Sequence, residues 1–431
     1  MLHERYPVPR APASGSLGHA SVARRRTPRA LTQGAGAFYG LAPTLVSLRM
    51  RPTVDARLPA APAAPAALAF LLAASLVIAT AACHGAGSGS RVVIGVAVNP
   101  TGSQTTTISR GVQIAIDALN VERRGRGAPF EMLLPPKGLR TAVELATFLR
   151  DTPSVVGVVG HTDSGGTLDA SSVYADDEDG GDHAVAAVSP TATSPALSGR
   201  SPWLFRVCPS DVAASRAAAR YVLDSLGARH AAIIYRNDSY GRDWARAFAG
   251  EYGAGGGAIV ERDPYLAGMG GWDAYAGYLQ KLGADVVLFP GNAEDAGALV
   301  DAMRAIGSHM PMLGGDAVSG LEDDGAKYAG VHFTTFFDAG RVRSAEGKAF
   351  VAAYQNKYGD LPDQRAALAY DAALVIGRAV LAVGPDRAKV RDWLAGVGTA
   401  HPAIRGATGP IAFDVRHDVV NKPVMIGTVA P

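Results

Sequence analysis

The sequence predicts an α/β protein with two doubly wound lobes. Short apolar segments alternate with amphipathic helical segments, which is typical of parallel sheets covered by helices on both faces. This alternation starts again after residues 206–209, and the chain makes further returns near its end. With 431 residues, the chain is long enough to bury two cores. We therefore expect a hinged, bilobal protein with a cleft between two sheets.

The first half of the chain supplies the first sheet. Its apolar runs are rich in Val and Ile and lack charges, as expected for strands buried on both faces. The expected strands cover 91–98, 130–134, 155–159 and 184–188, and the expected helices cover 108–119, 141–150 and a segment that starts at Thr167.

The second half repeats the pattern. Ser210 or Asp211 can cap its first helix, which runs through Leu226. The following strands are expected at 231–235, 258–261, 286–289, 312–314 and 331–337, and the helices at 244–252, 272–282, 293–306, 344–358 and 366–382.

The amino-terminal region reads as an export signal. The uncharged run 66–82 is short for a membrane span and has the length of a signal-peptide core. It ends in Thr80-Ala81-Ala82-Cys83, which resembles a bacterial lipobox with Thr in place of the usual Leu. We expect lipidation of Cys83, with a simple cleaved signal or a membrane anchor as alternatives. Cys208 then has no partner, so we expect no intramolecular disulfide.

The segments before the body follow from this signal. We expect 50–82 to be a lipoprotein signal peptide that begins at Met50, and 83–90 to be a flexible tether. Residues 1–49 are then a disordered leader or an error in the assigned gene start. The region before the apolar run holds nine arginines against two acidic residues, so the rest of a chain of net charge +2 is mildly acidic. Such a body gives no electrostatic case for nucleic acid as a partner.

Two loops at the carboxyl ends of neighbouring strands form the expected ligand site. The first loop covers 160–167 and the second covers 189–197, and both are rich in Gly, Ser and Thr. In open α/β sheets ligands bind at this edge, where free backbone N–H groups at a helix start suit a small anion such as a carboxylate. The sequence therefore predicts one half of a ligand cleft here.

Several stretches of the body resemble one known family. They include Val93-Ile94-Gly95-Val96, residues 188–195, Phe205-Arg206-Val207-Cys208-Pro209, residues 235–241 and Tyr370-Asp371-Ala372-Ala373. In this order and spacing, residues 91–429 resemble the type I periplasmic binding proteins of the leucine/isoleucine/valine group, the solute receptors of ABC importers.

The resemblance implies a domain layout and a mechanism. Three crossovers are expected near 206–210, 333–337 and 407–411, which divide the body into lobe 1 (91–207 and 336–408) and lobe 2 (208–335 and 409–431). The lobes would close on an amino acid or a similar small carboxylate, and the closed form would dock on a permease. We expect an exported monomer, held on the extracytoplasmic side of a membrane by its lipid anchor, with no cofactor.

The resemblance also implies which residues contact the ligand. Donors for a carboxylate are expected in lobe 1, and an acceptor for an ammonium group is expected in lobe 2, because neither charge can be buried unpaired. The expected carboxylate donors are Ser164, Gly165, the N–H group of Thr191, and Thr193. Asp316 is the expected acceptor for the ammonium group, and Tyr240 is expected to reach into the cleft from the second lobe. The loop 101–106 lacks the aromatic residue that some relatives place over the ligand side chain, and Asn292 stands where some relatives have a tyrosine. The implied pocket is therefore less aromatic and more polar than one for branched aliphatic amino acids.

Other functions are weighed against this one. Asp163-Ser164-Gly165-Gly166 resembles the signature of chymotrypsin-like proteases, but no His and Asp partners are evident and the strand–helix alternation contradicts an all-β fold. The acidic run 176–182 lacks the spacing of an EF-hand and is expected to be a solvated loop. No CxxC, HExxH or P-loop sequence occurs, so no metal or nucleotide is implied. A ligand-sensing lipoprotein that signals to a separate partner is the alternative function, and a structural lipoprotein comes third.

Overall fold

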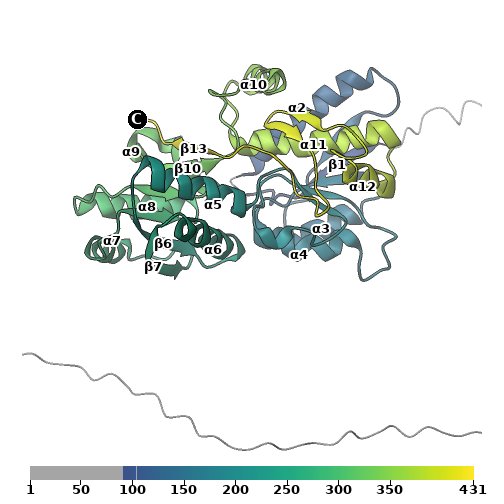
Figure 1. Ribbon diagram of the computed structural model, residues 1–431. Helices are drawn as coiled ribbons and strands as arrows, with labels where there is room; N and C mark the ends of the chain where they lie inside the picture. The colour runs from purple at the N-terminus through teal and green to yellow at the C-terminus, as the bar shows by residue number, and fades with distance from the viewer. Residues whose placement is uncertain (1–90, 103) are drawn as a thin grey trace, which may run out of the picture. The chain divides into compact units, whose positions relative to one another are not determined.

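A computed structural model describes residues 91–102 and 104–431 of the chain (Figure 1). The expectations for the leader, the signal peptide, the tether, Met50 and Cys83 lie outside these residues. The described chain contains two large sheets, with strand orders β2-β1-β3-β4-β5 and β13-β10-β9-β8-β6-β7. All the pairs in the first sheet are parallel, and in the second only β13 runs antiparallel to its neighbour. The predicted α/β class with two sheets is confirmed.

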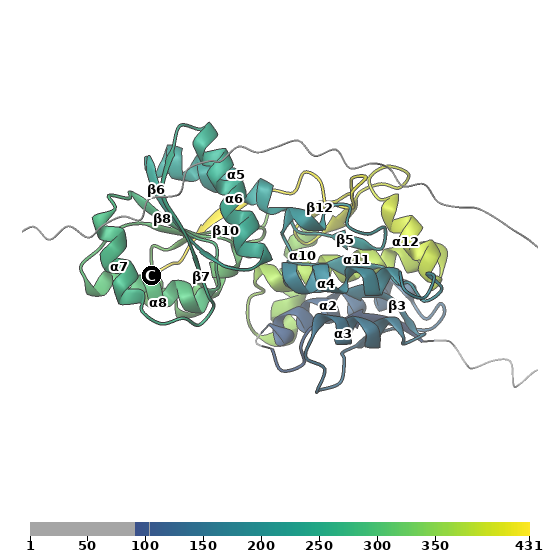
Figure 2. The same ribbon diagram turned by 90° about the horizontal axis from the view of Figure 1, so that it is seen from below.

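The first sheet is covered on both faces, as its apolar strands require. Its strands are β1 (Val92–Val96), β2 (Phe130–Leu133), β3 (Val155–Val159), β4 (Ala187–Ser189) and β5 (Leu204–Arg206). One face carries α2 (Thr105–Arg123), α11 (Gln364–Val383) and α12 (Arg387–Ala395), and the other carries α3 (Ala142–Arg150) and α4 (Ser164–Ala175) (Figures 1 and 2). Every residue of β1 and β3 is buried.

Close packing of α11 explains its hydrophobic sequence. A Cβ atom at Gly157 of β3 would lie 2.7 Å from the Ile376 side chain, so the helix sits directly on the strand. Among the described helices, α11 alone has the length and hydropathy of a membrane span, and 72% of its most apolar window is buried inside the protein. Its apolar residues therefore form the core of the first sheet.

The second sheet is also sandwiched between helices. Its strands are β6 (His230–Arg236), β7 (Ala258–Tyr265), β8 (Val286–Phe289), β9 (Met312–Gly314), β10 (His332–Thr335) and β13 (Met425–Thr428). Side chains of α5 (Asp211–Arg220) and α6 (Ser239–Ala254) pack on one face. The other face carries α7 (Trp272–Lys281), α8 (Ala293–Ala305) and the 3₁₀ segment η3 (Asp316–Asp324).

The chain passes between the two sheets at three places. Strand β5 leads into α5, and β10 leads through Phe336 towards α10 (Ala345–Tyr358). The third crossover lies later than the expected 407–411. After the β11–β12 hairpin (Ile404–Gly406 and Gly409–Ile411), Phe413, Val419 and Val424 still pack against the first core, and the chain joins the second sheet only at β13.

A buried ion pair explains why the segment 407–422 stays on the first sheet. The Lys422 Nζ atom lies 3.0 Å from Asp371 Oδ2, and both side chains are almost fully buried. The Asp371 carboxylate also accepts hydrogen bonds from the backbone N–H groups of Ala407 (2.6 Å) and Thr408 (3.2 Å). A buried carboxylate needs such partners, and they fix the segment 407–422 against α11.

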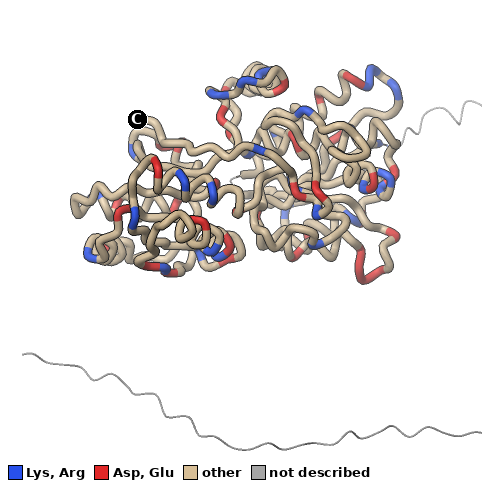
Figure 3. Tube along the Cα trace, viewed as in Figure 1, with Lys and Arg blue, Asp and Glu red and all other residues tan. Residues whose placement is uncertain are grey.

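The acidic run after α4 is only partly solvated. Asp176 is fully buried and lies 3.1 Å from Arg150 Nη1, whereas residues 177–183 are exposed. The prediction of a solvated loop is therefore wrong for Asp176, which ends α4 in a left-handed conformation (φ 57°). Elsewhere, basic and acidic residues are interspersed along the described chain (Figure 3).

Candidate functional site

The first loop of the site starts a helix earlier than the sequence analysis predicts. Helix α4 begins at Ser164 rather than Thr167, because Asp163 is its N-cap and accepts a hydrogen bond from the Gly166 N–H group (2.7 Å). Within the described chain, no acceptor is found for the N–H groups of Ser164 and Gly165. These two residues remain the available donors at this end of the first sheet.

The second loop is bonded to the first one. The Thr191 hydroxyl donates to the Thr162 carbonyl (2.6 Å), and the Ser194 N–H group donates to the Ser164 hydroxyl (3.2 Å). Thr191 can therefore offer its N–H group to a ligand but not its hydroxyl hydrogen. Thr193 is 1% exposed, and its hydroxyl has no well-aligned hydrogen-bond partner among the described residues. It lies close enough to the Asp211 carboxylate, however, to lower the pKa of that group.

Asp316 and Tyr240 lie together in the second lobe. Tyr240 is in the first turn of α6, and its hydroxyl donates to Asp316 Oδ1 (3.1 Å). Asp316 is 9% exposed, and its burial raises the pKa of its carboxyl group to about 6. Gly315 makes this contact possible, since a Cβ atom there would lie 1.9 Å from the Tyr240 hydroxyl.

Asp211 is a site residue that the sequence analysis missed. We considered it only as a helix cap, but the N-cap of α5 is Ser210 and no side chain caps this helix. Asp211 is fully buried, and both its carboxylate oxygens lack a hydrogen-bond partner in the part of the chain that the structure describes. Its burial raises the pKa of its carboxyl group well above the usual range, and the nearby Asp316 carboxylate raises that pKa further.

Asp211 is hydrogen-bonded to Thr193 through its backbone. Its N–H group donates to the Thr193 carbonyl (2.8 Å), so the first crossover is bonded directly to the second loop. The Asp211 carboxylate and the Thr193 hydroxyl are buried side by side, without a well-aligned hydrogen bond between them, and lie close to Asp316. Together they can accept hydrogen bonds from a cation with several hydrogens to donate. No pattern in the sequence marked Asp211 as a site residue, because an acidic residue at the start of a helix is common as a cap.

The two lobes approach each other at these loops. The Ser194 hydroxyl donates to Asp243 Oδ2 on α6. The starts of α4 and α6 are also close, since Ser239 Oγ lies 4.0 Å from the position that a Cβ atom on Gly165 would take. The arrangement can therefore present N–H and hydroxyl donors from the first lobe and carboxylate acceptors from Asp211 and Asp316 to one small molecule.

The geometry offers no catalytic base for Ser164. The Nε2 atom of His161 lies 2.9 Å from the Tyr174 hydroxyl, and burial lowers the pKa of this histidine to about 4. The Ser164 oxygen accepts the Ser194 N–H group instead. Residues 91–102 and 104–431 contain no cluster of His, Cys, Asp and Glu able to hold a metal ion.

Known proteins resemble this chain over most of its length. A family model described as periplasmic binding protein matches residues 92–430. An amino acid binding protein from Pseudomonas aeruginosa is 28% identical over 342 residues, which cover 76% of this chain and 87% of the relative. The Leu/Ile/Val-binding protein BraC3 from Rhizobium johnstonii is 27% identical and covers 60% of this chain and 70% of its own length.

A solved structure supports the same grouping. The branched-chain amino acid transporter substrate binding protein LivJ from Streptococcus pneumoniae, in complex with isoleucine, superposes with a TM-score of 0.71 and 27% identity. The match covers 79% of this chain and 96% of LivJ. These relatives are solute-binding proteins and not enzymes. The chain therefore belongs to the periplasmic binding protein family, in the group that includes the Leu/Ile/Val-binding proteins.

Proposed function

We propose that this protein is an extracytoplasmic receptor that binds an amino acid between its lobes and delivers it to the permease of an ABC importer. The observation that carries the proposal is the pair of buried carboxylates, Asp211 and Asp316, next to the Thr193 hydroxyl. Thr193 thereby moves from the carboxylate side of the ligand, where the resemblance placed it, to the ammonium side. An ammonium group supplies the charge and the three hydrogens that these acceptors lack. The amino acid binding relative from P. aeruginosa supports the same ligand class.

The ligand carboxylate occupies the first lobe in this proposal. It accepts hydrogen bonds from the Ser164 hydroxyl and from the N–H groups of Ser164, Gly165 and Thr191, at the start of α4 where the helix dipole favours a negative charge. Thr193 and Asp211, with Asp316 and its partner Tyr240, hold the ammonium group. Charges are thus paired at both ends of the ligand, as burial requires.

Hinge closure explains why the site draws residues from both lobes. The donors lie on α4 and its neighbouring loop, whereas Tyr240 and Asp316 lie on the second sheet. We propose that lobe 1 consists of residues 91–207 together with residues 336 to about 424, and that lobe 2 is the remainder of the body. The third boundary lies near 424 because Val424 still packs against the first core. Anchoring through Cys83 and a monomeric state complete the proposal.

A binding screen of the full chain tests this function. Isothermal calorimetry with each of the twenty standard amino acids should find at least one ligand, and Asp316→Ala should weaken its binding by about 100-fold or more, because a hydrogen bond to a charged group is lost and Asp211 alone remains. Asp324→Ala is the matched control, since Asp324 lies at the other end of η3 and caps nothing with its side chain. Absence of any amino acid ligand, or equal binding by both variants, would refute the proposal.

A further inference from the structure

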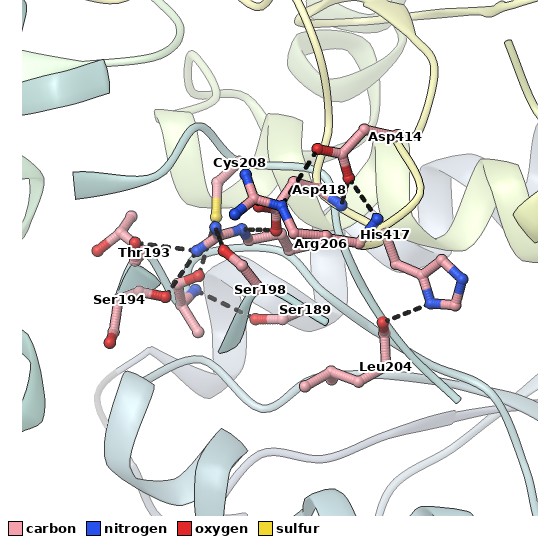
Figure 4. Close-up of polar contacts among 12 residues, drawn as sticks. Ser189, Thr193, Ser194, Ser198, Leu204, Arg206, Cys208, Asp414, His417 and Asp418 are labelled. Carbon is pink, nitrogen blue, oxygen red and sulfur yellow. Dashed lines mark hydrogen bonds and ion pairs between the residues drawn. The ribbon is translucent and has the colours of Figure 1, made fainter. Parts of the chain in front are cut away.

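Arg206 is a buried charge behind the second loop of the site, and it lies close enough to Asp211 to lower the pKa of that carboxyl group. It ends β5, is 2% exposed, and directs its guanidinium group towards the second loop of the site (Figure 4). Its Nη1 atom donates to the carbonyls of Thr193 (3.0 Å) and Ser194 (2.8 Å), and its Nη2 atom donates to the Ser198 hydroxyl (2.8 Å). Arg206 therefore holds the backbone of the loop rather than a side chain of the site.

The peptide group between Thr193 and Ser194 transmits this contact to Ser164. Its carbonyl accepts from Arg206 and from the Asp211 N–H group, so it is drawn into the protein. Its N–H group points the other way and donates to the Ser164 oxygen (3.2 Å). With this oxygen occupied as an acceptor, the Ser164 hydroxyl hydrogen is free to be donated to a ligand carboxylate.

Asp418 holds Arg206 from a distant part of the chain. Its Oδ1 atom lies 2.7 Å from Arg206 Nε, an ion pair that is close but poorly aligned as a hydrogen bond. Asp418 lies on the strap, which we define as residues 413–419. The strap is bonded to β5 by the hydrogen bond from Arg206 N to His417 O (3.2 Å).

Packing fixes the strap on the same strand. The His417 ring stacks on Phe205 with a centroid distance of 4.1 Å, and Phe413 contacts the same ring edge-on at 5.2 Å. The Asp414 carboxylate accepts hydrogen bonds from the N–H groups of Arg416 (2.8 Å) and Asp418 (3.0 Å), which closes the turn of the strap (Figure 4). Asp418 is thus presented to Arg206 by a rigid turn.

We propose that Arg206 and Asp418 are positioning residues for the carboxylate half of the ligand site, acting through the Thr193–Ser194 peptide group on the Ser164 hydroxyl. The inference rests on the proposed function, because it assigns the role of these residues to one half of the bound amino acid. Neither residue touches the ligand. The strap near the carboxyl terminus thereby becomes part of the binding machinery of a loop more than 200 positions earlier.

Charge and position make opposite predictions for Asp418→Asn. If Arg206 acted only through its charge, removal of the Asp418 carboxylate would leave more positive field near the ligand carboxylate and binding would tighten. If Arg206 acts by position, the loosened guanidinium group releases the peptide group and binding weakens. Arg206→Lys adds a second test, because it keeps the charge but cannot span both carbonyls and Ser198.

The experiment measures calorimetric binding of L-isoleucine and of (S)-2-methylbutylamine to the full chain; the amine has the same side chain and an ammonium group but no oxygen that could accept from Ser164. Asp418→Asn and Arg206→Lys should each raise the dissociation constant for L-isoleucine about tenfold but change that for the amine less than about twofold. Val415→Ala is the matched control, since Val415 lies on the strap and its side chain is almost fully exposed (97%). It should leave both constants unchanged.

Amide hydrogen exchange by mass spectrometry provides a readout that does not depend on a ligand. Exchange in a peptide covering residues 190–196 should accelerate in Asp418→Asn and Arg206→Lys but not in Val415→Ala, if the variants are otherwise folded. Equal exchange in all variants would overturn the inference, and so would tighter binding by Asp418→Asn or equal losses for the two probes. Failure of the native chain to bind any amino acid refutes the proposed function, and the inference falls with it.

Discussion

Asp316→Asn isolates the titration of the proposed ammonium acceptor. The carboxyl group of Asp316 has a pKa of about 6 in the folded protein against 3.8 for the ordinary group, because burial disfavours its charged form. Between pH 3.8 and about 6, the folded protein therefore still holds a proton on Asp316 that the unfolded chain has already released. Stability must fall as pH rises through this window, and the lost stability does not return above it.

The size of the effect follows from the same shift. A raise of about two pH units corresponds to about 3 kcal/mol of unfolding free energy, as an upper estimate. Asn keeps the oxygen that accepts the Tyr240 hydroxyl but cannot ionise. Relative to the native protein, Asp316→Asn should therefore gain about 3 kcal/mol of stability between pH 4 and pH 7.

Urea denaturation of both proteins at intervals from pH 4 to 7.5 measures this difference. Buried acids whose pKa does not depend on Asp316, such as Asp363, titrate in both proteins and cancel in the comparison. The pKa of Asp211 does not cancel, because the Asp316 charge that raises it is absent from the variant, and this adds to the stability that the variant gains. A saturating amino acid ligand should remove most of the pH dependence in the native protein, because its ammonium group pairs with the ionised carboxylate. A difference between native and variant that stays constant over this range would refute the reasoning.

Two further substitutions test the packing that supports the site. Gly111→Ala should destabilise the protein by about 1–3 kcal/mol, because the added Cβ atom would lie 2.1 Å from the Ala366 carbonyl oxygen and force α2 away from α11. Gly250→Ala is the control in urea denaturation, because the added Cβ atom would have no neighbour within 4 Å on an exposed helix face. This variant should be more stable than the native protein by about 1 kcal/mol. Equal effects of the two glycine substitutions would contradict the account. Lys422→Met should cost about 3–5 kcal/mol of unfolding free energy by leaving the Asp371 carboxylate without its buried cation. A cost below about 1 kcal/mol by the same measurement would show that the pair does not fix the third crossover.

Local patterns in the sequence predicted most of the fold. The all-apolar strands Val92–Val96 and Val155–Val159 need two covering layers of helices, and that requirement gives parallel sheets without further information. The donor loop around Ser164 was also predictable, because a glycine-rich turn between a buried strand and a helix exposes N–H groups wherever it occurs. The start of α4 at Ser164 was predictable as well, because an Asp three residues before Gly166 has the spacing of an N-cap.

Long-range contacts were beyond such patterns. Nothing near Asp211 in the sequence shows that its side chain leaves the helix cap unused and stays buried beside Thr193. The Arg206–Asp418 pair joins positions whose relation depends on how the return segment packs. The third crossover was displaced for the same reason, since Lys422 finds its partner Asp371 only in the folded core.

The central claim is that the ligand is an amino acid whose ammonium group is held by the buried carboxylates. A crystal structure of the full chain with the amino acid that it binds most tightly tests this claim most directly. The account predicts the ligand nitrogen within hydrogen-bond distance of Asp211, Asp316 and the Thr193 hydroxyl, and the ligand carboxylate at the start of α4. A ligand placed elsewhere, or with its carboxylate towards Asp316, would contradict the account.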